Sequence, residues 1–225
     1  DKAHVEEFHT TVAKGLFISK RARPDIQPTI AGLCTRVTKP NETDWRKLIR
    51  LIKYLNGTHR KILTLSADSL NVIKWHVDAS FAVHPDFKSH TGAVMTFGEG
   101  AVQSMSCKQK INTSSSTHAE LITADNAVVM ILWTKMFLEA QGYPVKQNIL
   151  YQDNKSAMLL EINGRQSAGK RSRALNIRLF FLTDQVEQKN LEVLFRPTNK
   201  MWGDFMSKPL QGRKFVDFRR HIMGN

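Results

Sequence analysis

The chain has 225 residues, of which 41% are hydrophobic and 24% charged, and its 33 Lys and Arg against 20 Asp and Glu give a formal net charge of +13. This length predicts one domain of about 150 residues with a smaller appendage. The basic excess favours a nucleic acid over an anionic membrane as partner, and no apolar run approaches the roughly 20 residues that a membrane span needs.

Two further features concern the context of the chain. Cys34 and Cys107 lie far apart and in no metal-ligand spacing, which predicts free buried thiols in a reducing compartment. The chain begins at Asp1 without the pattern of a signal peptide, so we expect a piece of a longer protein.

Helical spacing of apolar residues dominates the first part of the chain. Helices are expected over 5–19, over 26–38 after Asp25 as N-cap, and over 45–55 before Gly57 as a left-handed C-terminal residue. The third helix also has a cationic face, formed by Arg46, Lys47, Arg50 and Lys53. Such a face is either a solvated surface or a contact to a nucleic-acid backbone.

After Thr58 the apolar spacing changes from period 3.6 to period two, which predicts a boundary between about 58 and 69. We therefore expect a helical segment over 1–65 and a β-rich unit over 66–225. The first three strands of this unit form an antiparallel meander, and the following strand, helix and strand imply a parallel crossover. The expected elements are strands over 71–78, 91–97 and 101–108, a helix over 117–141, a strand over 148–152, a helix over 154–160, a helix containing Leu175, Leu179, Leu182 and Val186, a strand over 191–196 and a final short helix.

Four acidic residues lie where these elements begin or end, namely Asp78, Glu120, Asp153 and Asp204. Each alone has a structural explanation: Asp78 as a turn residue, Asp153 as part of a helix cap, and Asp204 as a first-turn acid favoured by the helix dipole. Glu120 fits a capping box with Thr117. Taken together, in this order and in these elements, the four acids predict a site for divalent metal ions.

The motifs around the four acids carry a resemblance to a known family. They occupy residues 77–80, 89–92, 108–110, 114–121, 151–157, 176–178 and 203–210. Over most of residues 71–210 the chain resembles the RNase H domain of copia-type LTR retrotransposon Pol polyproteins. Residues 1–65, through the stretches 23–26 and 51–58, resemble the thumb or connection segment of the preceding reverse transcriptase. The resemblance implies an α/β fold, with an RNase H-like mixed five-stranded sheet flanked by helices and preceded by a small helical segment.

The resemblance also implies an activity, the endonucleolytic hydrolysis of the RNA strand of RNA–DNA hybrids by two Mg²⁺ ions during reverse transcription, with Mn²⁺ as an alternative ion. Asp78 would bridge both ions, while Glu120, Asp153 and Asp204 would complete their coordination. The residue types suit this chemistry, because Mg²⁺ prefers oxygen ligands and two ions about 4 Å apart can activate water and stabilise the leaving oxygen. Without metal, four clustered carboxylates would repel one another.

Contacts to nucleic acid are expected around this site and in the basic loop over 163–173, for which a solvated surface is the alternative. The expected partners are an RNA–DNA hybrid and the polymerase domain of the reverse transcriptase in cis, without a membrane. The cytoplasm, in a virus-like particle by family likeness, is the expected location, with the nucleus as the alternative. The residues expected to bind nucleic acid are Ser89, Thr91, Lys108, Lys110, Asn154, Lys155, Arg165, Lys170, Arg171, Arg173, Arg178 and Lys208.

The sequence departs from the family pattern in two places. The loop over 197–203 lacks the His of many cellular RNases H, and 174–178 reads Ala-Leu-Asn-Ile-Arg where His-Ile-Asp-Ile-Arg is usual. His76, His84 and His90 lie near the predicted site and are more commonly surface or core residues than catalytic ones.

Three other classes of protein were weighed. A DDE-type integrase would place its Glu last among the acids. An exonuclease of related fold would have an acid at the position of Ser80. A non-catalytic connection module that binds nucleic acid without hydrolysis is the main alternative, and the presence of all four acids argues against it.

Overall fold

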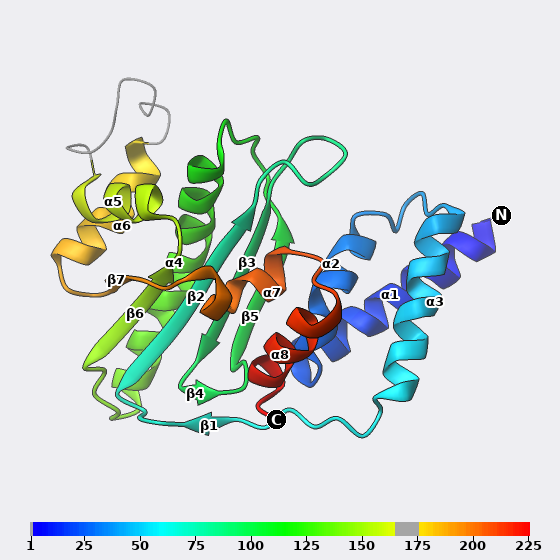
Figure 1. Ribbon diagram of the computed structural model, residues 1–225, viewed down its shortest axis with the longest axis horizontal. Helices are drawn as coiled ribbons and strands as arrows, with labels where there is room; N and C mark the ends of the chain where they lie inside the picture. Colours follow the sequence, from blue (N-terminus) through cyan, green and yellow to red (C-terminus); the bar gives the residue numbers. More distant parts are fainter. Residues whose placement is uncertain (1, 165–175) are drawn as a thin grey trace.

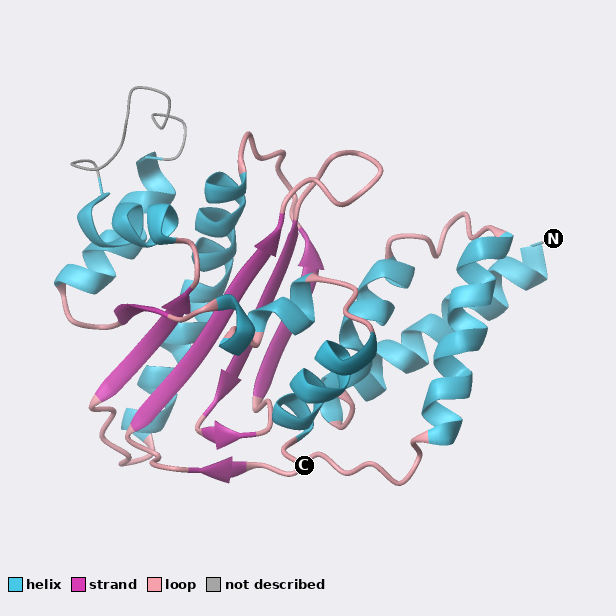
Figure 2. Ribbon diagram, viewed as in Figure 1, coloured by secondary structure: helices cyan, strands magenta, loops and turns pink. Residues whose placement is uncertain are grey.

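The computed structural model describes residues 2–164 and 176–225. Three N-terminal helices lie beside a unit built on a sheet (Figures 1 and 2). These helices have their own apolar core, in which Phe8, Ile30 and Leu48 are almost completely buried. The helices are α1 (Lys2–Arg21), α2 (Gln27–Cys34), which follows the 3-10 turn η1 (Pro24–Ile26), and α3 (Glu42–Gly57).

Two details of these helices differ from expectation. Asp25 is not an N-cap but is buried inside η1, where Arg23 donates to its Oδ2 at 2.8 Å and the hydroxyl of Tyr54 donates at 2.6 Å. Because the Asp25 carboxylate is engaged by Arg23 and Tyr54, it does not cap the following helix. Gly57 is the last residue of α3 and is not left-handed; Thr58 caps the helix instead. At the other end of α3, Asn41 and Asp44 form a capping box.

The sheet has five strands in the order β5-β3-β2-β6-β7. β2 pairs antiparallel with β3, which pairs antiparallel with β5, while β6 runs parallel to both β2 and β7. The mixed five-stranded sheet expected from the resemblance is thus confirmed. A short pairing of β1 (Ser66–Ala67) with β4 (Gly98–Glu99) was not expected. The five strands are β2 (Val72–Ser80), β3 (His90–Thr96), β5 (Gln103–Lys108), β6 (Gln147–Gln152) and β7 (Glu192–Phe195).

Helices cover both faces of the sheet (Figure 1). On one face α4 packs through residues such as Ala127 and Ile131 against Trp75. On the other face α7 and α8 pack through Phe205 and Ile222, among others. The remaining elements are α4 (Ser116–Ala140), α5 (Lys155–Asn163), α6 (Asn176–Glu187), the 3-10 turn η4 (Thr198–Lys200), α7 (Gly203–Ser207) and α8 (Gly212–Met223). The sequence reading did not predict α8.

By length and composition α4 could also cross a membrane, and among the described residues it is the one helix with this property. Its mean hydropathy is 1.4 over a window that is 44% buried, so it packs in the position of a core helix while its other side exposes Trp133 and Met136. Cys34 and Cys107 are both free thiols as predicted, but neither is fully buried: Cys34 is partly buried and Cys107 is exposed.

Candidate metal centre

Three of the four predicted carboxylates lie together beside β2. Asp78 lies on β2, Glu120 is the fifth residue of α4, and Asp153 directly follows β6. One oxygen from each lies within 4.8 Å of the other two. The parallel pairing of β2 with β6 explains the proximity of Asp78 and Asp153, because both strands lead toward the same edge of the sheet. Asp78 is not the strand end, since β2 continues to Ser80.

Glu120 is not part of the predicted capping box. The N-cap of α4 is Ser115, whose hydroxyl accepts from the backbone N–H of His118 at 3.1 Å. The helix therefore begins one residue before Thr117, which places Thr117 inside the helix rather than at its cap. Thr117 and Glu120 therefore do not form a capping box, so the position of the Glu120 side chain needs another explanation.

The environment of Glu120 supplies that explanation. Its residue is 5% exposed, and its Oε2 is buried without a hydrogen-bond partner in the described part of the chain. Burial, followed by the charges of Asp78 and Asp153, raises the pKa of Glu120 well above its usual value, while a backbone hydrogen bond from Ala79 opposes this shift. An unpartnered buried oxygen is costly. A cation with a preference for oxygen ligands would satisfy it, so the three carboxylates fit a metal ion of that kind.

Asp204, the fourth carboxylate, is completely buried and is held by two ammonium groups. Lys208 donates to its Oδ1, and the Nζ of Lys214 lies 2.6 Å from its Oδ2. The Nζ of Lys208 also lies 3.1 Å from Asp78 Oδ1, so this lysine joins the two carboxylates. Burial raises the pKa of Asp78 to about 7, an effect that the charge of Lys208 opposes.

Two glycines bring α7 onto the sheet. A Cβ on Gly92 of β3 would lie 2.5 Å from the backbone N of Ser207, and a Cβ on Gly203 would lie 2.8 Å from the backbone N of Asp78. Both distances are shorter than real Cβ contacts, so only glycine permits this approach. The close approach places Asp204 beside Asp78 and lets the hydroxyl of Ser207 donate to Asp78 Oδ2.

Most of the described residues that were expected to bind nucleic acid have structural contacts of their own. Ser89 and Thr91 are completely buried and bond internally, for example to Thr113 and Thr123. Their side chains are therefore closed to a ligand in this structure. Lys208 lies at the carboxylates rather than on an open surface.

Other members of that set lie at the surface or outside the described residues. Lys108 pairs with Asp86 at 2.6 Å, Asn154 caps α5, and Lys110 and Lys155 are exposed. The structure does not describe Arg165, Lys170, Arg171 and Arg173, nor the side chain of Arg178.

The three histidines are not among the clustered ligands. His76 is buried and stacks on Trp202 at 4.5 Å between ring centroids. His84 and His90 bond to each other at 3.0 Å, and His90 bonds to Ser106 at 2.8 Å. Sequence reasoning missed Ser207 and Lys214 as contacts of the acids. The only signal was their position near Asp204 in the chain.

Comparison with known proteins shows similarity to retrotransposon polyproteins. The chain is 28% identical over 209 residues to the Pol polyprotein of transposon TNT 1-94 from Nicotiana tabacum, covering 92% of this chain. It is 23% identical over 219 residues to the Ty1-JR2 Gag-Pol polyprotein of Saccharomyces cerevisiae, covering 95% of this chain. The chain is therefore similar to a region of copia/Ty1-type retrotransposon Pol polyproteins. It spans only 16% and 12% of the lengths of these two relatives.

Two further comparisons are less informative. No family model matches the chain. A solved structure of LC11-RNase H1 is 15% identical to this chain and overlaps 58% of this chain and 88% of its own, with a TM-score of 0.43. The fold assignment therefore depends on the strand order and helix positions described above.

Proposed function

We propose that this Pol region hydrolyses the RNA strand of RNA–DNA hybrids in a reaction that depends on Mg²⁺. The observation that carries the proposal is the cluster of Asp78, Glu120 and Asp153 with its unpartnered buried Glu120 oxygen. Similarity to Pol polyproteins supports the choice of substrate, since such elements replicate through reverse transcription.

The residues around the cluster prepare it for a phosphodiester. Thr198 donates to Asp153 Oδ2 at 2.8 Å and so orients that carboxylate. The backbone N–H of Ala79 holds Glu120, and Ser207 holds Asp78. Mg²⁺ bound by these oxygens would supply positive charge to the scissile phosphate and to the attacking water. Asp204 lies next to Asp78 as the fourth ligand of the proposed two-ion site.

The test uses a hybrid whose RNA strand carries a fluorescent label, incubated with the protein in Mg²⁺ or in EDTA. We expect cleavage in Mg²⁺ alone. Asp78→Asn and Asp153→Asn should abolish cleavage while the proteins remain folded, because each change removes a ligand charge and keeps the side-chain shape. Asp217→Asn is the matched control, since Asp217 is a half-exposed acid of α8 paired with Arg213 at 3.7 Å.

Two results would contradict the proposal. Full cleavage by either Asp78→Asn or Asp153→Asn would show that the cluster is not the catalytic centre. A parent protein that binds the hybrid and does not cleave it in Mg²⁺ or Mn²⁺ would instead support the non-catalytic module that binds nucleic acid.

A further inference from the structure

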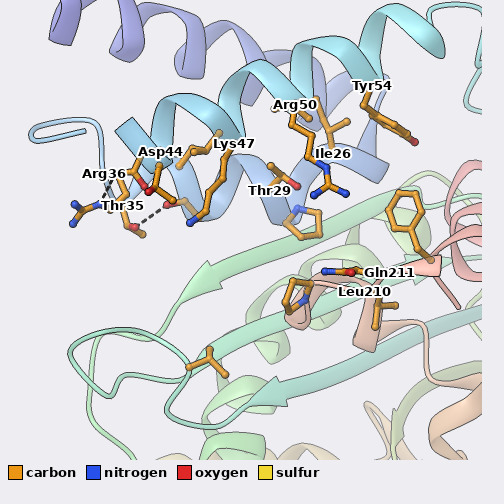
Figure 3. A pocket seen from close by; sticks show the side chains of 18 of the residues that line it. Ile26, Thr29, Thr35, Arg36, Asp44, Lys47, Arg50, Tyr54, Leu210 and Gln211 are labelled. Atoms are coloured by element: carbon orange, nitrogen blue, oxygen red, sulfur yellow. Dashed lines mark hydrogen bonds and ion pairs between the residues drawn. The ribbon is translucent and has the colours of Figure 1, made fainter. Parts of the chain in front are cut away.

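A cavity of about 1000 Å³ lies between the N-terminal helices and the RNase H-like unit. α3 forms one side, and the segment that joins α7 to α8 forms the other. Figure 3 shows Lys47 and Arg50 extending from α3 toward the side formed by Leu210 and Gln211. From the sequence, the cationic face of this helix was expected to contact either solvent or nucleic acid. In the structure, Lys47 and Arg50 of this face line the cavity.

The charge inside this groove is positive. Two acids line it, but Asp25 is paired with Arg23 at 2.8 Å and Asp44 with Arg36 at 3.0 Å. Lys47 and Arg50 have no ion pair within the part of the chain that the structure describes. The two residues are exposed and one helical turn apart, so their charges lie side by side. This arrangement suits a ligand with successive negative charges.

Two segments that line the groove are connected to the elements around the carboxylate centre. Pro209 and Leu210 line the groove and directly follow Lys208, the lysine that joins Asp78 to Asp204. On the opposite side His84 lines the groove and bonds to His90.

A chain of hydrogen bonds continues from there to the helix that carries Asp204. His90 bonds to the hydroxyl of Ser106 at 2.8 Å, and that hydroxyl donates to the carbonyl of Met206 in α7 at 2.7 Å. Hydrogen bonds therefore link His84 in the wall of the groove to α7, the helix that carries Asp204.

We propose that this groove binds the sugar-phosphate backbone of the nucleic acid whose other part lies at the carboxylates, with Lys47 and Arg50 each contacting a phosphate. This inference rests on the proposed function, because it identifies the path of the same substrate. The net charge of +13 favours a polyanion. The two remaining cations of the helix face, Arg46 and Lys53, do not line the cavity.

The helix therefore supplies its own control. Lys47→Gln with Arg50→Gln removes two charges that line the groove, and Arg46→Gln with Lys53→Gln removes two charges from the same helix outside it. All four side chains are exposed, so both variants should fold. Binding of a fluorescent hybrid would be measured in EDTA, where cleavage does not occur, across a series of KCl concentrations.

Each phosphate contact contributes about 0.9 to the slope of log affinity against log salt for duplex DNA and about 0.7 for single strands. The groove variant should therefore lose about 1.4–1.8 from the slope, and the control variant less than about 0.5. Equal losses in the two variants, or an unchanged slope in the groove variant, would overturn the proposal.

The same experiment separates this proposal from the proposed function. If the groove variant loses the expected slope while the parent fails to cleave the hybrid, the groove stands and the hydrolysis fails. If the parent cleaves the hybrid and the groove variant keeps its slope, the hydrolysis stands and the groove fails. Binding of inorganic phosphate or a mononucleotide at Lys47 and Arg50 without an effect on the slope would also refute a polynucleotide path.

Discussion

The carboxylate cluster makes a prediction with an uncommon sign: Glu120→Gln should stabilise the protein when metal is absent. Most substitutions of buried residues destabilise. Here the parent holds three carboxylates whose oxygens lie within 4.8 Å of one another, and one Glu120 oxygen has no partner in the described structure. Gln keeps the shape, removes one charge, and can donate a hydrogen bond to Asp78 or Asp153.

The magnitude follows from the geometry. Two unit charges 4.8 Å apart interact by about 3 kcal/mol at an effective dielectric constant of about 20. The raised pKa of Glu120 lets the parent relieve part of this repulsion by taking up a proton. We therefore expect Glu120→Gln to gain about 1–3 kcal/mol in EDTA at pH 8, a rise of about 2–12 °C in Tm for a chain of this size.

The assay is thermal unfolding in EDTA and in Mg²⁺ or Mn²⁺. An ion at 100 times its Kd stabilises the parent by about 2.7 kcal/mol, and Glu120→Gln should lose most of that gain. Glu161→Gln is the control, because Glu161 is also a buried acid with a raised pKa but lies outside the cluster. It should keep the full response to metal. The reasoning is refuted if Glu120→Gln is less stable than the parent in EDTA and still responds to metal.

Three other predictions follow from the same structure. Burial raises the pKa of Glu161 to about 7. Because the unfolded chain releases this proton at a lower pH than the folded protein, the free energy of unfolding should fall as the pH rises from about 4.5 to 7. Glu161→Gln lacks this titration and should be more stable than the parent at pH 8 by up to about 3 kcal/mol. A pH series of urea unfolding curves checks this, and a constant difference between the two proteins would contradict it. Lys208→Met leaves two buried carboxylates without their shared cation, so it should cost about 1–3 kcal/mol in EDTA, less than a fully buried pair because Lys208 is 35% exposed. In Mn²⁺ this loss should shrink, and an equal loss in both conditions would show that Lys208 does not occupy a cation position. Ser115→Ala should cost about 0.5–2 kcal/mol as the lost N-cap of α4, whereas Thr117→Ala should cost less than that in the same melts; the reverse order would restore the capping box.

Strand β2 was predictable because its apolar residues Ile73, Trp75 and Val77 alternate with polar ones, whereas β3 is buried along its whole length and lacks this alternation. The pairing of β1 with β4 covers only two residues of each strand, which is too short to show a periodic pattern of apolar residues. α8 was missed although Phe218 and Ile222 have helical spacing, because it follows the last recognisable motif of the family. Helix ends were missed where tertiary contacts compete for a capping side chain, as the hydrogen bond from Tyr54 to Asp25 shows.

The site was predictable in its residue types and only partly in its geometry. The four acids were identified from the elements that carry them, and the structure brings three of them together. The contact between Lys208 and Asp78 was not predictable, since it joins residues 130 positions apart. Ser89 and Thr91 were expected to bind nucleic acid, but both are buried. A single sequence does not reveal this burial.

The four acids differ in how their charge is balanced, and this difference determines how cations can enter. Asp78, Glu120 and Asp153 face one another with an unpartnered oxygen, so an ion meets a prepared set of ligands there. Between Asp78 and Asp204 the ammonium group of Lys208 already lies at hydrogen-bonding distance from both. An ion that bridges those two carboxylates has to displace Lys208, and the side chain is free to leave because about a third of it is exposed. The loss of Lys208 should therefore strengthen ion binding at the Asp204 side and leave the side of Glu120 and Asp153 unchanged, which a titration of Mn²⁺ into Lys208→Met would resolve as a change in one of two sites.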